Sequence, residues 1–144
     1  MKPHQAVIDT SVLVAAARSR LGASFHLLNL FASEDTRWEW NISTALLLEY
    51  EAVLKREQHR MGRDLKTVER MLDDIASRAN RHAIFYLIRP FLTDADDEFV
   101  LELAVASASD YIVTHNRGDF REAARFGVNV VTPAEFLRII GERI

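Results

Sequence analysis

Short apolar runs alternate with longer helix-like stretches along this chain of 144 residues. The first run, Ala6–Ile8, is followed by strand-like segments at 38–42, 111–114 and 128–131. Runs that are apolar on both faces are typical of strands in a parallel sheet covered by helices. The alternation therefore predicts an α/β protein, a three-layer α/β/α domain with a mainly parallel central sheet.

Capping residues and apolar stripes at helical spacing predict the helices between these runs. We expect helices at 12–18 with Gly22 as a stop, from Ser24 to 31, from Ser43 or Thr44 to 58, after Asp64, from 97 to 108 and at 120–125. The best-specified start is Thr132-Pro133-Ala134-Glu135, which combines an N-cap, a proline at the first helical position and a capping-box glutamate. Residues 82–92 favour a strand, but a helix is also open there.

Length and composition restrict the class of protein. A chain of this size is expected to form one domain, residues 1–144, around a single core. Its hydrophobic content of 49% is too high for a disordered chain. The absence of cysteine excludes disulfides and zinc–thiolate sites and fits a reducing cytoplasm. Because no apolar run is long enough to span a bilayer, we expect a cytoplasmic protein without membrane contact.

The net charge of −3 is unevenly distributed. Residues 55–70 contain six lysines and arginines against three acids, and residues 91–110 contain six acids and no base. A basic flank beside an acidic pocket suits a metal-dependent enzyme that acts on a phosphodiester. Two solvated helix faces of opposite charge would produce the same pattern.

Four acidic residues, Asp9, Glu49, Asp97 and Asp119, have no obvious basic partner nearby in the sequence. Asp9 ends the first strand, and ligands of open α/β sheets bind at the carboxyl ends of strands. Glu49 lies among apolar helical neighbours, where an unpaired carboxylate is costly. Carboxylates that gather in one cleft repel one another and require a cation, so we expect a metal site.

Each of these acids also has a structural interpretation. Asp9, Asp97 and Asp119 are placed where aspartate commonly caps a helix or lies in its first turn. A salt bridge to a distant arginine would account for Glu49. In the acid-rich stretch around Asp97, Asp94 is a reserve ligand, and Glu98 and Glu102 are expected to be solvated.

The order of four motifs resembles the PIN-domain nucleases, and within them the VapC-like toxins of toxin–antitoxin pairs. The motifs are Val7-Ile8-Asp9-Thr10-Ser11, Leu48-Glu49-Tyr50-Glu51, Asp94-Ala95-Asp96-Asp97 and Thr114-His115-Asn116 with Asp119-Phe120. The resemblance covers nearly the whole chain and makes Asp9, Glu49 and Asp97 the principal acids, with Ser11, Thr114 and Asn116 supporting them. Many PIN domains carry aspartate where this chain has Asn116, and Asp119 is expected to supply that charge.

The resemblance implies a metal-dependent endoribonuclease that forms a homodimer and is blocked by a small antitoxin protein. Asp9, Asp97 and Asp119 would hold Mg²⁺ or Mn²⁺, and Glu49 would orient or deprotonate the attacking water, which also makes it a candidate metal ligand. The RNA backbone would contact basic residues near the cleft: Lys55, Arg56, Arg60, Arg63, Arg117 and Arg121.

Two other classes of protein remain as alternatives. A PIN fold that has lost catalysis and acts only through a protein partner is kept open by Asn116. A haloacid-dehalogenase-like phosphohydrolase or a receiver-like phosphoacceptor also has an aspartate at the end of its first strand. The former requires a second aspartate where Ser11 stands, and the latter requires a lysine late in the chain, whereas the last lysine is Lys66.

Overall fold

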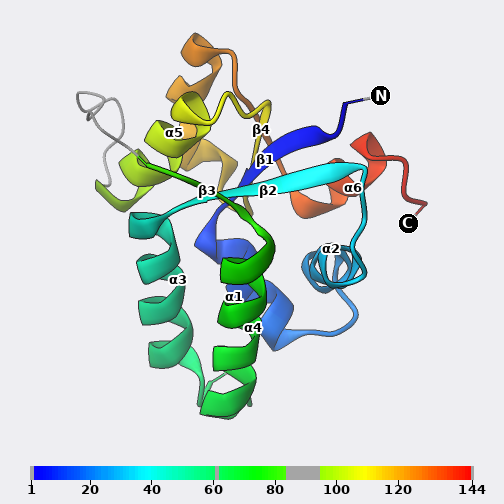
Figure 1. Ribbon diagram of the computed structural model, residues 1–144, viewed down its shortest axis with the longest axis vertical. Helices are drawn as coiled ribbons and strands as arrows, with labels where there is room; N and C mark the ends of the chain where they lie inside the picture. Colours follow the sequence, from blue (N-terminus) through cyan, green and yellow to red (C-terminus); the bar gives the residue numbers. More distant parts are fainter. Residues whose placement is uncertain (1, 61, 84–94, 144) are drawn as a thin grey trace.

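The computed structural model describes residues 2–60, 62–83 and 95–143, and of residues 95–97 it describes the backbone alone. Within these residues strands and helices alternate (Figure 1). In chain order the elements are β1 (His4–Ile8), α1 (Thr10–Arg18), α2 (Ala23–Ala32), β2 (Trp38–Ser43), α3 (Thr44–Glu57), α4 (Leu65–Arg78), β3 (Asn80–His82), α5 (Ala95–Ala106), β4 (Tyr111–Val113), the 3-10 helix η1 (Arg117–Phe126), β5 (Asn129–Val131) and α6 (Pro133–Ile139).

The strands form one five-stranded sheet in the order β3-β2-β1-β4-β5. Every neighbouring pair is parallel, with Ala6 of β1 opposite Trp40 of β2 on one side and Tyr111 of β4 on the other. The chain builds one half of the sheet outward from β1 and then crosses to build the other half. The strand order therefore reverses between β1 and β4, which is the position where open α/β sheets bind ligands.

Helices cover both faces of this sheet. Helices α1, α3 and α4 lie on one side and α5 lies on the other (Figure 1). On the side of α2 and α6, Trp38 packs edge-on against Phe136 of α6, with ring centroids 5.5 Å apart, and Phe31 of α2 packs against both Trp38 and Trp40. The predicted three-layer α/β/α arrangement with a parallel sheet is confirmed.

Three predicted helix starts have the expected caps. The Ser43 hydroxyl accepts a hydrogen bond from the backbone N–H of Leu46 at 3.2 Å, and the Asp64 carboxylate accepts one from Thr67 at 2.8 Å. Thr132 and Glu135 form a reciprocal capping box ahead of α6. These signals succeed because all of their partners lie within one helical turn.

Several predicted boundaries were wrong. Gly22 begins α2 as its N-cap instead of stopping α1, and α1 already ends at Arg18. Ser24 does not cap α2, because it lies inside the first turn and its hydroxyl bonds with His115 at 2.8 Å. The short helix expected at 120–125 is the 3-10 helix η1.

The ambiguous segment 82–92 lies mostly outside the described residues, as does Asp94. The short strand β3 ends at His82, at the beginning of this segment, and it pairs in parallel with β2. No helix in the described part of the chain is both long and apolar enough to cross a membrane.

Candidate active site

Asp9 follows β1 directly and occupies the N-cap position of α1, but its carboxylate does not cap the helix. The side chain forms no hydrogen bond with the backbone of α1. Its Oδ2 atom instead accepts hydrogen bonds from the Ser11 hydroxyl at 2.7 Å and from the Thr114 hydroxyl at 2.8 Å. Asp9 is only 7% exposed, so these two donors compensate part of the cost of burying its charge.

The loop after β4 is attached to the same network. The backbone N–H of His115 donates to the Ser11 hydroxyl at 3.2 Å, and the backbone N–H of Asn116 donates to the Thr114 hydroxyl at 2.9 Å. The predicted supporting residues Ser11 and Thr114 therefore join the carboxyl ends of two adjacent strands, β1 and β4, around Asp9.

Glu49 reaches the site from α3. It is half-buried at the edge of a cavity, and its Oε2 atom accepts a hydrogen bond from the Thr10 hydroxyl. The next residue, Tyr50, is fully buried and donates its hydroxyl proton to the backbone carbonyl of Ile8, the residue before Asp9. Burial raises the pKa of the Tyr50 hydroxyl well above its ordinary value, so this donor stays protonated.

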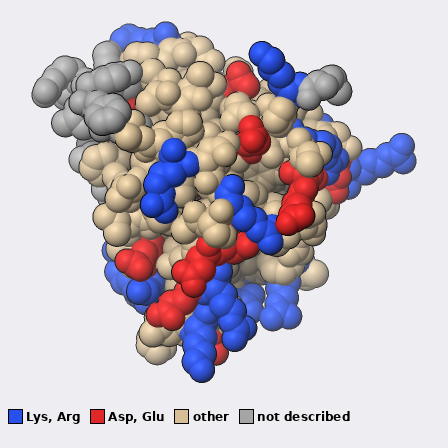
Figure 2. All heavy atoms as spheres, in the orientation of Figure 1, with Lys and Arg blue, Asp and Glu red and all other residues tan. Residues whose placement is uncertain are grey.

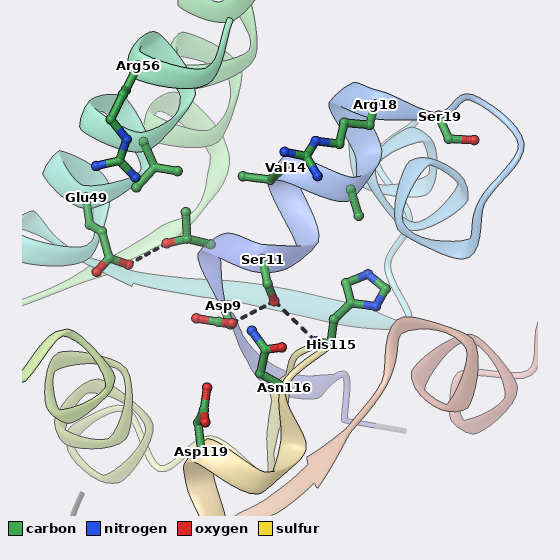
Figure 3. A pocket seen from close by; sticks show the side chains of 13 residues that line it. Asp9, Ser11, Val14, Arg18, Ser19, Glu49, Arg56, His115, Asn116 and Asp119 are labelled. Carbon is green, nitrogen blue, oxygen red and sulfur yellow. Dashed lines mark hydrogen bonds between the residues drawn. The ribbon is translucent and has the colours of Figure 1, made fainter. Parts of the chain in front are cut away.

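Asn116 and Asp119 complete the wall of the cavity opposite α3. Asn116 precedes η1 without forming a side-chain cap, and Asp119 lies in the first turn of η1 with an exposed side chain. Figure 3 shows both side chains directed towards Asp9, with Glu49 facing them from α3. The cavity that these side chains share has a volume of about 770 Å³.

Asp97 lies in the first turn of α5, as the sequence predicts, but its side chain is outside the described residues. Among the described side chains, no three acidic or imidazole groups lie close enough together to hold a metal ion. The expectation that Glu98 and Glu102 are solvated was wrong, since they are 9% and 5% exposed. Glu98 and Glu102 lie about one helical turn apart, so they share one face of α5. Helix α5 packs against the central sheet and the neighbouring helices.

Of the six basic residues expected to contact RNA, Arg56 alone lines this cavity. Arg63 donates to the backbone carbonyl of Ala17 at 3.0 Å, a structural contact. The other four pair with their own neighbourhood: Lys55 with Glu51, Arg60 with Glu57, Arg117 with Glu135 and Arg121 with the carbonyl of Gly118. In Figure 2 basic and acidic side chains intermingle at the lower end of the molecule, near the loop that joins α3 to α4.

Several residues that line the cavity were missed by the sequence interpretation, among them Thr10, Arg18 and His115. Thr10 appears in the sequence only as part of the first motif, His115 is a lone loop histidine without a spacing signal, and Arg18 lies at the end of α1. The His115 ring is held by the buried hydroxyl of Ser24. The periodicity of α1 carries the only usable signal, because Ser11 and Arg18 are seven residues apart and share one helix face.

The side chains around Asp9 offer mainly oxygen donors. Hard divalent cations such as Mg²⁺ and Mn²⁺ prefer carboxylate and amide oxygens. Neither Asp9 nor Asp119 forms an ion pair with a basic side chain in the part of the chain that the structure describes. The chemical type of these donors therefore suits a hard cation, whereas the described acidic groups do not by themselves form a cluster that could hold one.

Comparison with known proteins places this arrangement in a family. The family model of the PIN domain matches residues 5–118, and the chain belongs to the PIN domain family. PIN domains are generally nucleases that use divalent metal ions. No protein of curated function matches the sequence significantly.

Solved structures share the fold at low sequence identity. The PAE2754 protein of Pyrobaculum aerophilum has a TM-score of 0.61 at 17% identity and covers 95% of this chain and 89% of its own. VapBC2 of Rickettsia felis, bound to a DNA fragment from its promoter, has a TM-score of 0.57 at 17% identity and covers 88% and 96%. A PilT N-terminus domain protein of Sulfolobus solfataricus P2 has a TM-score of 0.56 at 15% identity and covers 97% and 96%.

Proposed function

We propose that this chain is a metal-dependent endoribonuclease and the toxin half of a toxin–antitoxin pair. The observation that carries the proposal is the convergence of Asp9, Glu49 and Asp119 on one cavity at the carboxyl ends of β1 and β4. Membership of the PIN domain family supports hydrolysis of a nucleic-acid phosphodiester. The resemblance of the motifs to VapC-like toxins supports RNA as the substrate.

In this proposal Asp9, Asp97 and Asp119 hold Mg²⁺ or Mn²⁺, with Asn116 as a further oxygen donor. The bound cation lowers the pKa of water and offsets charge on the phosphoryl oxygens. Because Ser11 and Thr114 both donate to Oδ2 of Asp9, the other oxygen of that carboxylate remains free of these two donors.

Glu49 orients or deprotonates the attacking water and is a further candidate ligand. The Thr10 hydroxyl donates a hydrogen bond to Oε2 of Glu49. This bond limits the rotation of the Glu49 carboxylate, which lines the cavity. Tyr50 fixes the same turn of α3 to the end of β1, which holds Glu49 at a constant position relative to Asp9.

Cleavage of labelled single-stranded RNA in the presence of Mn²⁺ tests the proposal. We expect wild type to cleave and Asp9→Asn to lose about a hundredfold or more in rate, because a charged ligand is removed. Asp110→Asn is the matched control, since Asp110 is exposed and lies just before the first residue of β4, whereas the cavity lies at the carboxyl end of that strand. Wild type that cleaves no RNA with Mg²⁺ or Mn²⁺ would favour a PIN-fold binding module without catalysis.

The partners form a second part of the proposal. We expect induced expression of wild type to arrest growth of a bacterial host, and co-expression of a short protein encoded beside it to relieve that arrest. Light scattering of the purified chain tests the homodimer. Growth arrest by the Asp9→Asn variant would separate toxicity from cleavage and count against this function.

A further inference from the structure

Two arginines, Arg18 and Arg56, line the cavity on the side away from Asp9. Arg18 is the last residue of α1 and Arg56 lies in the last turn of α3. In Figure 3 the two side chains face each other across the cavity, with Val14 between Arg18 and the acidic residues. The cavity therefore has an acidic end and a basic end.

The two helices place these arginines in the same way. Arg18 follows Ser11 by seven residues, and Arg56 follows Glu49 by seven residues. Seven residues are about two helical turns, so each arginine shares a face with its site residue and lies roughly 10 Å further along the helix axis. That separation is larger than one phosphate group, so the arginines are suited to a different phosphate from the one at the acidic end.

The Glu57 carboxylate lies near three basic side chains. Its carboxylate is 3.9 Å from Arg18 Nη2, 3.9 Å from Arg56 Nε and 3.7 Å from Arg60 Nη1. These separations are longer than hydrogen-bonded ion pairs, so the guanidinium N–H groups are not used up by Glu57. The Arg18 and Arg56 side chains are 54% and 70% exposed, which leaves them accessible to a ligand.

The wall between the two ends of the cavity is apolar, with Val14 and Ala15 from α1 and Val53 from α3. An acidic end and a basic end with an apolar wall between them suit a substrate that presents one phosphate to the metal-binding acids and another to the arginines. Guanidinium groups bind phosphate through paired N–H donors, which favours arginine at such a position.

We propose that Arg18 and Arg56 form a second subsite, which binds a backbone phosphate next to the scissile one. This inference rests on the proposed nuclease function. It specifies the substrate further, as an oligonucleotide whose neighbouring phosphate is bound before cleavage, in preference to an isolated phosphodiester. Arg18 and Arg56 are thus substrate-binding residues, distinct from the acids that act on the scissile phosphate.

Two substrates that differ in the neighbouring phosphate test the subsite. Bis(p-nitrophenyl) phosphate has a single phosphodiester, whereas a short single-stranded oligoribonucleotide has several. The quantity measured is kcat/KM for the oligoribonucleotide divided by kcat/KM for bis(p-nitrophenyl) phosphate, both with Mn²⁺. We expect Arg18→Gln and Arg56→Gln each to lower this ratio about tenfold, the size of one lost charged hydrogen-bond contact.

Arg125→Gln is the matched control, because Arg125 is exposed, pairs with Glu122 at 2.8 Å and does not line the cavity. Its ratio should equal that of wild type. The slope of log affinity for the oligoribonucleotide against log salt concentration should also become shallower by about one in Arg18→Gln but not in Arg125→Gln. A ratio unchanged in both cavity variants would overturn the subsite.

If wild type hydrolyses neither substrate, the proposed nuclease function fails and the subsite is decided by binding alone. Fluorescence anisotropy of the labelled oligoribonucleotide with Ca²⁺ then replaces the kinetic ratio. Binding about tenfold weaker in Arg18→Gln than in Arg125→Gln would support the subsite. Equal affinity in these two variants would overturn it.

Discussion

Tyr50 joins the helix that carries Glu49 to the strand that leads into Asp9. Its hydroxyl donates to the carbonyl of Ile8 and accepts a hydrogen bond from the indole N–H of Trp40 at 3.3 Å. All three residues are buried, so water does not replace a lost partner. At this scale one phenol oxygen links the two segments that carry Asp9 and Glu49.

We expect Tyr50→Phe to lower the free energy of unfolding by about 1 to 3 kcal/mol, because two buried polar groups lose this partner. Urea denaturation measures the difference. Tyr111→Phe is the control, since the Tyr111 hydroxyl has no hydrogen bond to a described residue. Equal effects of the two substitutions would contradict a specific role for the Tyr50 hydroxyl.

The Tyr50→Phe substitution should also change how the stability of the protein depends on pH. Burial raises the pKa of Tyr50 in the folded state above its ordinary value of 10, so the unfolded chain loses its phenol proton first as pH rises. The contribution of Tyr50 to the free energy of unfolding of wild type is therefore fully present below pH 10 and decreases as pH rises above it. The decline should be smaller in Tyr50→Phe, which has no phenol to titrate.

At the scale of the elements, α6 shows how local signals specify a helix. Thr132 accepts a hydrogen bond from the backbone N–H of Glu135 at 3.2 Å, and the Glu135 carboxylate accepts one from the backbone N–H of Thr132 at 2.8 Å. The latter bond lowers the pKa of Glu135. Because α6 has only seven residues, its caps are a large part of its hydrogen bonding.

Thr132→Ala should lower the free energy of unfolding by about 1 kcal/mol, the usual effect of losing an N-cap side chain. Thermal unfolding followed by circular dichroism measures it. Thr36→Ala is the matched control, because Thr36 is exposed and outside the helices, and its effect should stay within about 0.5 kcal/mol. A loss in Thr36→Ala as large as that in Thr132→Ala would show that capping is not the cause.

At the scale of the whole molecule, the strand order decides where the acids meet. Asp9 and Asp119 are far apart in sequence, but β1 and β4 are neighbours and both run towards the same edge of the sheet. Helix α3 then brings Glu49 to that edge from one side. A cation bound there contacts several elements at once, so its binding stabilises the folded state as a whole.

Mn²⁺ should therefore raise the melting temperature of wild type. At a hundredfold excess over Kd the gain is about 2.7 kcal/mol, or roughly 5 to 10 °C for a chain of this size. Differential scanning calorimetry should show this rise in wild type and in Asp110→Asn, and its loss in Asp9→Asn. A full Mn²⁺ response in Asp9→Asn would mean that the cation binds elsewhere.

Features whose partners lie close together in the chain were determined by the sequence itself. The capping box at Thr132, the caps at Ser43 and Asp64 and the alternation of strands with helices are such features, because the bonds and periodicities involved span one or two turns. The order of the motifs also identified Asp9, Glu49 and Asp119 as candidate site residues.

Only the tertiary structure decided which of these residues touch. Thr10 and Glu49 are 39 positions apart, and Thr114 and Asp9 are 105 positions apart, yet both pairs are hydrogen-bonded. No local propensity encodes such pairs, because they depend on the strand order of the sheet and on how α3 packs beside α1. The placement of Arg18 opposite Arg56, and of Glu98 and Glu102 in the interior, was decided in the same way.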